Sequence, residues 1–91
     1  NLESPYARAA LRQFYMLIHA GKVEHCSLAA FEAMTGLSLT DDSGCLKDEL
    51  PPITTFLNRL LALTIGMQNI LFKMFEQLLA AKVESAIAGG S

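Results

Sequence analysis

A chain of 91 residues has room for one small domain, and a hydrophobic fraction of 52% is high for a soluble chain of that length. Its formal net charge of −2 gives no overall attraction to a phosphate backbone, and its 2 cysteines are too few for the disulfide framework of a small secreted protein. No apolar run reaches the roughly 18 uncharged residues of a membrane span, so we expect a soluble intracellular protein with an apolar surface that packs against a partner.

The first predicted helix covers residues 5–20. Ser4 and Pro5 favour its start, because serine is a good N-cap and proline is tolerated at the first helical position, and Gly21 favours its end. The apolar positions fall on one side of the helix and predict its buried face: Ala7, Ala10, Leu11, Phe14, Tyr15, Leu17 and Ile18.

A basic row follows one flank of this helix, where Arg8, Arg12 and His19 recur at helical spacing. Such a row is usually a solvated face, and three cationic positions without aromatic residues between them leave a weak footprint for nucleic acid. Arg8 and Arg12 are therefore weak candidates for phosphate contact.

A second, brief helix is predicted at residues 28–35. Ser27 is its N-cap and Gly36 ends it, and residues 40–44 form a turn or small hairpin because Asp, Ser and Gly supply turn geometry. A helix-turn-helix that reads DNA would need polar or basic side chains at the start of this helix. Residues 27–32 are mostly apolar, so DNA reading by this helix is not expected.

The third helix, predicted at residues 52–63, begins at Pro52, which is suited to a first helical turn. Asn58 and Arg59 lie on its polar side. Its buried side is predicted to consist of the apolar residues Ile53, Phe56, Leu57, Leu60, Leu61 and Leu63.

The fourth helix, predicted at residues 65–88, has apolar positions that cover about 200° of its circumference, roughly twice the arc of an ordinary surface helix. The centre of this face is predicted to be Met67, Ile70, Leu71, Met74, Phe75 and Leu78. The few helices of a short chain cannot cover so wide a face, so part of it should meet a surface outside this sequence. The candidate interface residues are Ile65, Phe72, Leu79 and Val83, and the isolated chain is expected to dimerise through them.

Together these elements predict an all-α fold, a small four-helix domain over residues 1–91 with a long C-terminal helix and a short turn or hairpin between the second and third helices. The last two helices are expected to pair, with the first two covering one side. Because the chain starts at Asn1 without a methionine and ends in Gly-Gly-Ser, it is expected to be a fragment of a larger protein or the product of processing.

Residues that could carry chemistry are few. The 2 histidines and 2 cysteines match a zinc site in number, but His25 and Cys26 are adjacent while His19 and Cys45 are isolated, which is not the spacing of zinc ligands. Cys26 beside His25 could form a nucleophile and its base, but adjacent side chains usually diverge and no oxyanion-donor motif follows. No glycine-rich phosphate loop opens a helix. No catalytic, cofactor-binding or metal-binding residue is therefore predicted.

Two stretches carry a family resemblance: FLNRLLAL at residues 56–63 and QNILF at residues 68–72. They resemble the C-terminal region of the strawberry notch family of helicase-like proteins, whose bacterial members are sometimes labelled methylases or helicases. Upstream, YARAAL at residues 6–11 is similar to a family stretch that commonly has glycine at its second position. FEAMTGL at residues 31–37 and LPPI at residues 50–53 are also similar, so the resemblance covers nearly the whole chain.

The resemblance implies a parent protein of helicase superfamily 2, an ATP-dependent remodeller of nucleic acid with ATPase motifs on two RecA-like lobes. The chain would follow the arginine-containing motif of the second lobe, and none of those motifs is present in its 91 residues. ATP and magnesium are therefore implied for the parent only, and the isolated chain is expected neither to hydrolyse ATP nor to unwind duplexes. Whether it forms part of an enzyme depends on that parent.

The family-like stretches also contain the candidate functional residues, which are Asn58, Arg59, Gln68 and Asn69. Asn58 and Arg59 have a second interpretation, in which Asn58 bonds to nearby backbone and Arg59 lays its aliphatic stem on apolar neighbours. Substitution of both residues separates the two interpretations.

The leading functional hypothesis is a helical accessory or interaction segment of a helicase-like protein, without catalytic motifs of its own. The alternatives are a free-standing dimerisation module and a small nucleic-acid-binding domain. The expected partner is a neighbouring RecA-like lobe of the parent or a second copy of the chain. We expect the chain to contact nucleic acid only as part of the parent protein and not to associate with a membrane. We expect a cytoplasmic location if the protein is bacterial.

Overall fold

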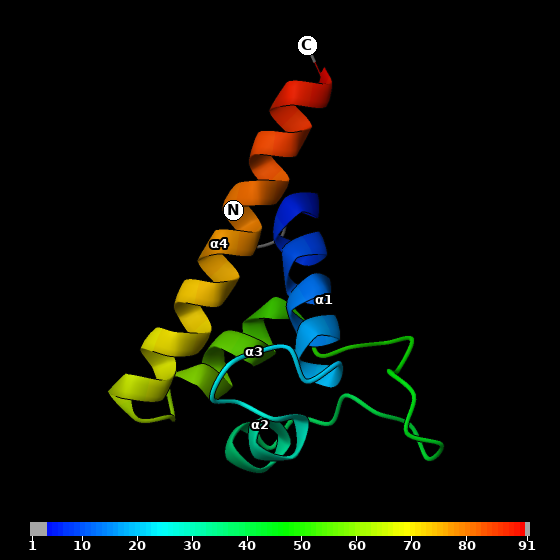
Figure 1. The fold of residues 1–91 in the computed structure, drawn as a ribbon, viewed down its shortest axis with the longest axis vertical. Coiled ribbons are helices and arrows are strands. Elements are labelled where there is room, and N and C mark those ends of the chain that lie inside the picture. The colour runs from blue at the N-terminus through cyan, green and yellow to red at the C-terminus, as the bar shows by residue number, and fades with distance from the viewer. Residues whose placement is uncertain (1–3, 91) are drawn as a thin grey trace.

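The computed structural model describes residues 4–90, which form four helices joined by loops. They are α1 (Pro5–His19), α2 (Leu28–Thr35), α3 (Ile53–Leu60) and α4 (Ile65–Gly90). Figure 1 shows α4 as the longest element, with α1 beside it and with α2 and α3 near the end of the pair at which α4 begins. The predicted all-α fold with a long last helix is confirmed. Within residues 4–90, none of the helices combines the length and hydrophobicity that a membrane crossing requires.

The first two helices are capped at the predicted residues. The Ser4 hydroxyl oxygen accepts the N–H of Ala7 at 3.1 Å, and the Ser27 hydroxyl oxygen accepts the N–H of Ala30 at 3.1 Å. Gly36 ends α2 with a φ of 72°, in the left-handed conformation that glycine adopts without a steric penalty. These ends are therefore set by local sequence.

The third helix, α3, is shorter than predicted at both ends. Pro52 is its N-cap and not its first helical residue, and its last helical residue is Leu60. Beyond that end, the side-chain Nε2 of Gln68 donates to the carbonyl oxygens of Leu61 at 3.3 Å and Leu63 at 3.0 Å, so these acceptors are satisfied without a further helical turn. Leu61, predicted on the buried side, is 72% exposed because it lies past the last helical turn.

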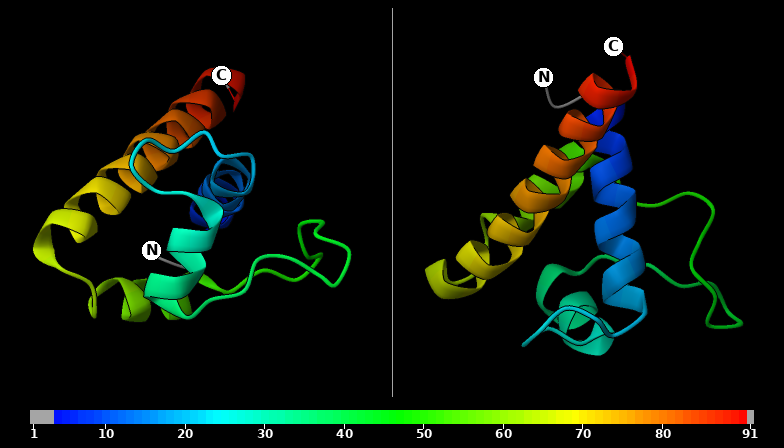
Figure 2. Two further views of the ribbon diagram at one scale, coloured as in Figure 1. Left: turned by 60° about the horizontal axis from the view of Figure 1, so that its bottom comes forward. Right: turned by 45° about the horizontal axis from the view of Figure 1, so that its top comes forward.

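The long helix α4 packs chiefly along α1, and the two helices run in opposite directions (Figures 1 and 2). The expectation that the last two helices form the main pair is therefore wrong. α1 presents Ala7 and Ala10, whose buried small side chains allow a close approach, whereas α3 has only 8 residues to offer. On α4, Leu71 and Phe75 are buried, while Ile70, predicted at the centre of the apolar face, is 39% exposed.

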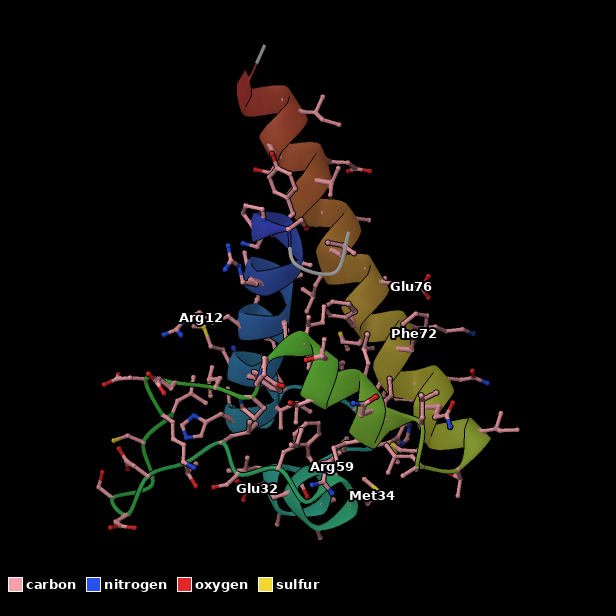
Figure 3. The ribbon with its side chains drawn as sticks, turned by 180° about the vertical axis from the view of Figure 1, so that it is seen from behind. Arg12, Glu32, Met34, Arg59, Phe72 and Glu76 are labelled. Carbon is pink, nitrogen blue, oxygen red and sulfur yellow. The ribbon has the colours of Figure 1, made fainter. Side chains whose placement is uncertain are left out.

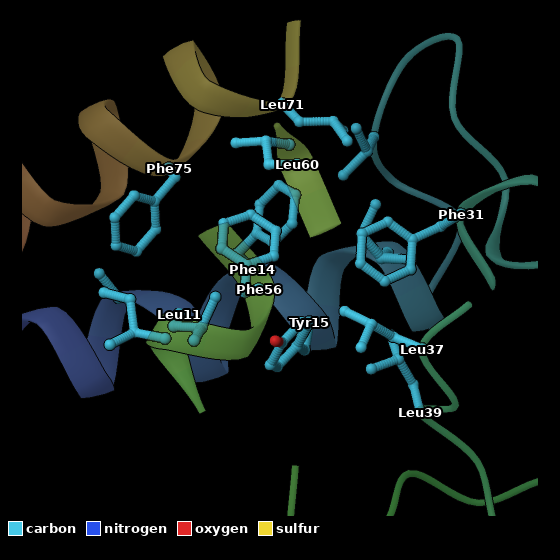
Figure 4. Close-up of a cluster of buried hydrophobic side chains, with 14 of the residues drawn as sticks. Leu11, Phe14, Tyr15, Phe31, Leu37, Leu39, Phe56, Leu60, Leu71 and Phe75 are labelled. Atoms are coloured by element: carbon cyan, nitrogen blue, oxygen red, sulfur yellow. The ribbon is translucent and has the colours of Figure 1, made fainter. Parts of the chain in front are cut away.

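The core is an aromatic cluster to which every helix contributes (Figure 4). Phe14 and Phe56 are closest, with ring centroids 5.4 Å apart, and Phe56 lies 5.9 Å from Phe75. Phe31 meets both Phe14 and Tyr15 edge to face at 6.2 Å. Tilted and edge-to-face rings at such separations add to the stabilisation from burial.

Side-chain hydrogen bonds attach the long segment between α2 and α3 to the helices. The Tyr15 hydroxyl donates to the carbonyl oxygen of Pro51 at 3.0 Å. The Glu32 carboxylate accepts the N–H of Leu39 at 2.8 Å, which holds the buried Leu39 against α2. The Pro51 carbonyl and the Leu39 N–H are backbone groups in irregular structure. Such groups need a side-chain or water partner when they are buried.

The predicted turn or hairpin in this segment is a turn closed by a single antiparallel bridge between Thr40 and Leu46. Its turn is tied to the end of α1, because the Nε2 of His19 donates to the carbonyl oxygen of Gly44 at 2.9 Å. His19 is half-buried at this contact, whereas His25 is exposed.

The end of α2 also lies against α3, through Gly36 and Arg59. A Cβ atom added to Gly36 would lie 3.3 Å from an Nη atom of Arg59. The cationic guanidinium therefore sits beside the C-terminal end of α2, where the helix dipole favours positive charge. Arg59 remains exposed to solvent, so this contact is with the surface of the domain and not with its core.

Removing the Glu32 carboxylate should destabilise the domain. Glu32→Ala leaves the N–H of the buried Leu39 without its acceptor, so we expect a loss of about 1–3 kcal/mol in the free energy of unfolding. Glu32→Gln keeps a carbonyl oxygen and should retain most of the stability. Urea unfolding followed by circular dichroism measures both variants, and an unchanged midpoint for Glu32→Ala would contradict the role given to this bond.

Gly36→Ala should destabilise the domain more than Gly44→Ala. Both glycines have positive φ, so either substitution carries about 1 kcal/mol of backbone strain, but only the Cβ at Gly36 meets a neighbour, the Arg59 guanidinium. Adding Arg59→Ala to the Gly36 variant should remove the difference. Thermal unfolding of the three variants tests this, and equal melting temperatures for the two glycine variants would argue against the contact.

The buried Tyr15 hydroxyl should make the fold sensitive to alkali. Burial raises the pKa of Tyr15 above its ordinary value of 10.0, so the folded state holds the side chain neutral. The contribution of the neutral Tyr15 side chain to stability is complete below the ordinary pKa of 10.0. As the pH rises above that value, the free energy of unfolding falls by up to about 1.4 kcal/mol per pH unit. Tyr15→Phe should flatten the dependence of unfolding free energy on pH in this range. An equally steep alkaline loss in that variant would assign the effect to another group.

Candidate interaction site

An apolar groove lies between α3 and the first turns of α4, with a volume of about 310 Å³. We call it the α3–α4 groove. It is lined by Leu57, Leu60, Leu61, Gln68, Asn69 and Phe72. Figure 3 shows Phe72 on the side of α4 that faces away from α1. The groove therefore lies where α3 meets the start of α4.

Large apolar side chains at this groove remain in contact with water. Phe72 is 43% exposed, and Leu61 and Ile65 at the turn between the helices are 72% and 75% exposed. Phe72 follows Leu71 and is turned about 100° from it around the helix, so it cannot share the buried position that Leu71 occupies. Exposed apolar side chains gathered at a concave surface are characteristic of contact sites.

The four predicted interface residues are placed differently by the structure. Phe72 lines the α3–α4 groove, and Ile65 is exposed at the start of α4. Leu79 and Val83 are half-buried, and Leu79 packs partly against the core. Leu61 was missed as an exposed residue. Thr64 could have indicated this exposure, because threonine is a good N-cap and its hydroxyl accepts the N–H of Met67 at the start of α4. A helix start at that position leaves residues 61–63 to form the turn.

Gln68 and Asn69, predicted as functional residues, both line the α3–α4 groove. Gln68 already has a structural role, since its Nε2 donates to two carbonyl groups of the turn after α3. Asn69 is exposed at the groove, where its amide can donate to or accept from a bound chain. The structure therefore places the candidate functional residues Gln68 and Asn69 at the same groove as the candidate interface residue Phe72.

Asn58 and Arg59, the other predicted functional pair, line neither this groove nor the second cleft described below. Both side chains are exposed. The guanidinium of Arg59 lies beside Gly36 at the end of α2, so the functional role expected of this pair stays a prediction.

The two weak phosphate-contact candidates come together at a second cleft, of about 300 Å³. Arg8 and Arg12 form its edge, together with Leu11 and Tyr15 of α1 and residues 50–53 of the segment that leads into α3. Figure 3 shows Arg12 projecting from α1 on the side opposite α4. The third member of the predicted basic row, His19, bonds to Gly44 and does not line the cleft.

Groups that could support catalysis are separated in the described part of the chain. Within residues 4–90, no three His, Cys, Asp or Glu side chains are close enough together to hold a metal ion. Cys26 is buried and Cys45 exposed, and both are free thiols. Burial raises the pKa of the Cys26 thiol, which is the opposite of the shift that activates a nucleophile. The neighbouring His25 points to solvent and lies 3.9 Å from Glu24.

A comparison with protein-family models matches residues 1–91 to a helicase C-terminal family described as "C-terminal domain on Strawberry notch homologue". Neither a search of curated proteins nor a search of solved structures found a match. The resemblance carried by residues 56–63 and 68–72 is thereby confirmed. The chain belongs to the family of C-terminal domains of Strawberry notch homologues.

Proposed function

We propose that this domain is a helical accessory module of a helicase-like protein, and that its α3–α4 groove docks on a neighbouring RecA-like lobe of that protein. The observation that carries the proposal is the uncovered apolar groove, whose lining includes the exposed Phe72. The module has no catalytic residues and no cofactor of its own. Any ATP or magnesium is bound by the lobes of the parent.

Docking at this groove has a favourable energetic basis. A phenylalanine side chain can bury on the order of 200 Å², so covering the exposed part of Phe72 would stabilise a complex by about 2 kcal/mol. Leu61 and Ile65 add further apolar area, and Asn69 supplies a polar group at the same surface. A large apolar anchor beside a few polar groups is the composition of an interaction hot spot.

A docking role fits the domain better than nucleic-acid binding does. The net charge is −2, and no cationic residue lines the α3–α4 groove. Self-association remains the expected behaviour of the isolated chain, because a second copy can cover the same groove by twofold symmetry when the lobe is missing. The dimer would then replace a contact that is intramolecular in the parent.

Phe72→Glu should disrupt the proposed contact in the full-length helicase-like protein. A charge in the groove should increase hydrogen–deuterium exchange in the residues of α3 and α4 that line it and in the lobe that covers them, and lower ATP turnover. Gln77→Glu is the matched control, because it adds the same charge at an exposed position of α4 outside the groove. Exchange that is the same in both variants and in the unmodified protein would sink the docking proposal.

The same pair of variants tests self-association of the isolated chain. We expect the unmodified chain and Gln77→Glu to sediment as dimers at concentrations of about tens of micromolar, and Phe72→Glu to sediment as a monomer with unchanged helical circular dichroism. A monodisperse monomer for the unmodified chain would show that the groove is not a self-association surface.

A further inference from the structure

The cleft at Arg8 and Arg12 is a second candidate binding site, with no lining residue in common with the α3–α4 groove. It lies between α1 and the segment that leads into α3, and it holds about 300 Å³. That volume is at the lower end of the range for pockets that bind small ligands or single side chains. Its edge is cationic and its floor is apolar.

The two arginines carry charge that the domain does not neutralise. Both are exposed, they are one helical turn apart, and neither forms an ion pair, since the one ion pair in residues 4–90 joins His25 and Glu24. α1 contains no acidic residue, and Arg8 lies near its N-terminal end, where the helix dipole disfavours cations. Like charges four residues apart also destabilise a helix. A bound anion would offset both effects.

The floor and wall of the cleft are apolar and held in place. Leu11, Tyr15 and Ile53 are buried beneath it. The Tyr15 hydroxyl donates to the carbonyl oxygen of Pro51, which fixes the wall formed by two prolines whose backbone is already rigid. A ligand would therefore meet a preformed surface and lose little free energy to ordering it.

We propose that this cleft binds a polypeptide segment in which an acidic side chain adjoins an apolar one. A guanidinium presents paired N–H donors that match a carboxylate, and two of them at the edge can grip one acidic side chain while its neighbour lies on Leu11 and Ile53. A polynucleotide fits less well. Tyr15, the aromatic residue in the cleft lining, is buried and cannot stack on a base.

The test uses the isolated chain and an acetylated, amidated hexapeptide of alternating leucine and glutamate, with glutamine in place of glutamate as the neutral counterpart. In two-dimensional NMR spectra, the acidic peptide should shift the guanidinium Nε–H signals of Arg8 and Arg12 and the amide signals of Leu50 and Ile53. The neutral peptide should bind about tenfold more weakly, because it cannot form charge-assisted bonds.

Arg8→Gln with Arg12→Gln should lower the affinity for the acidic peptide about tenfold. Lys22→Gln with Lys73→Gln is the matched control, since it removes the same charge from exposed positions outside the cleft and should leave affinity unchanged. Equal losses in the two double variants, or shifts away from the cleft, would overturn the proposal. So would tighter binding of a single-stranded oligothymidylate of about ten nucleotides that depends on the same arginines, because it would assign the cleft to nucleic acid.

Discussion

The aromatic cluster is the contact on which the rest of this small domain depends. Helices of 8 residues such as α2 and α3 are not stable alone in water, so they exist here because each delivers one ring to a shared core. Phe31 and Phe56 are those rings, and Phe14 lies against both. Once these positions are filled by α1, α2 and α3, only one narrow face of α4 is needed to close the core. For that reason Ile65, Ile70, Phe72 and Ile87 of α4 remain exposed.

The apolar groove and the cationic cleft are thus products of the same packing. α1 uses one face against α4 and leaves its arginines on the opposite side, at the segment that enters α3. α3 is short and ends before Leu61, so the turn into α4 leaves leucine and phenylalanine side chains at the surface. The two sites lie on different parts of the domain, so occupation of one does not block the other. A module of this kind can contact two partners or two parts of one parent.

Local sequence predicted the helices and most of their ends, because serine caps and a left-handed glycine act within a few residues. Periodicity also showed that α4 had more apolar surface than a small domain could cover. It could not show against which helix α4 would pack, since the apolar face of a helix indicates which of its residues are buried but not which element covers them. The bonds from Tyr15 to Pro51 and from His19 to Gly44 join residues 36 and 25 positions apart, and no local pattern encodes them. The cationic cleft depends on the first of these bonds, so only the basic row, and not the site, could be read from sequence.

The pairing of the first helix with the last has a consequence for how the chain folds as it is synthesised. α1 meets α4, the helix with which it has its main contact, only when residues 65–90 have left the ribosome. Until then, the part of α1 that packs against α4 is open to chaperones and to other nascent chains. Closure of the core is therefore a late, non-local event, and its rate is governed by the search of two distant helices for each other. A stop codon before α4 would yield a chain in which the surface of α1 that packs against α4 stays exposed.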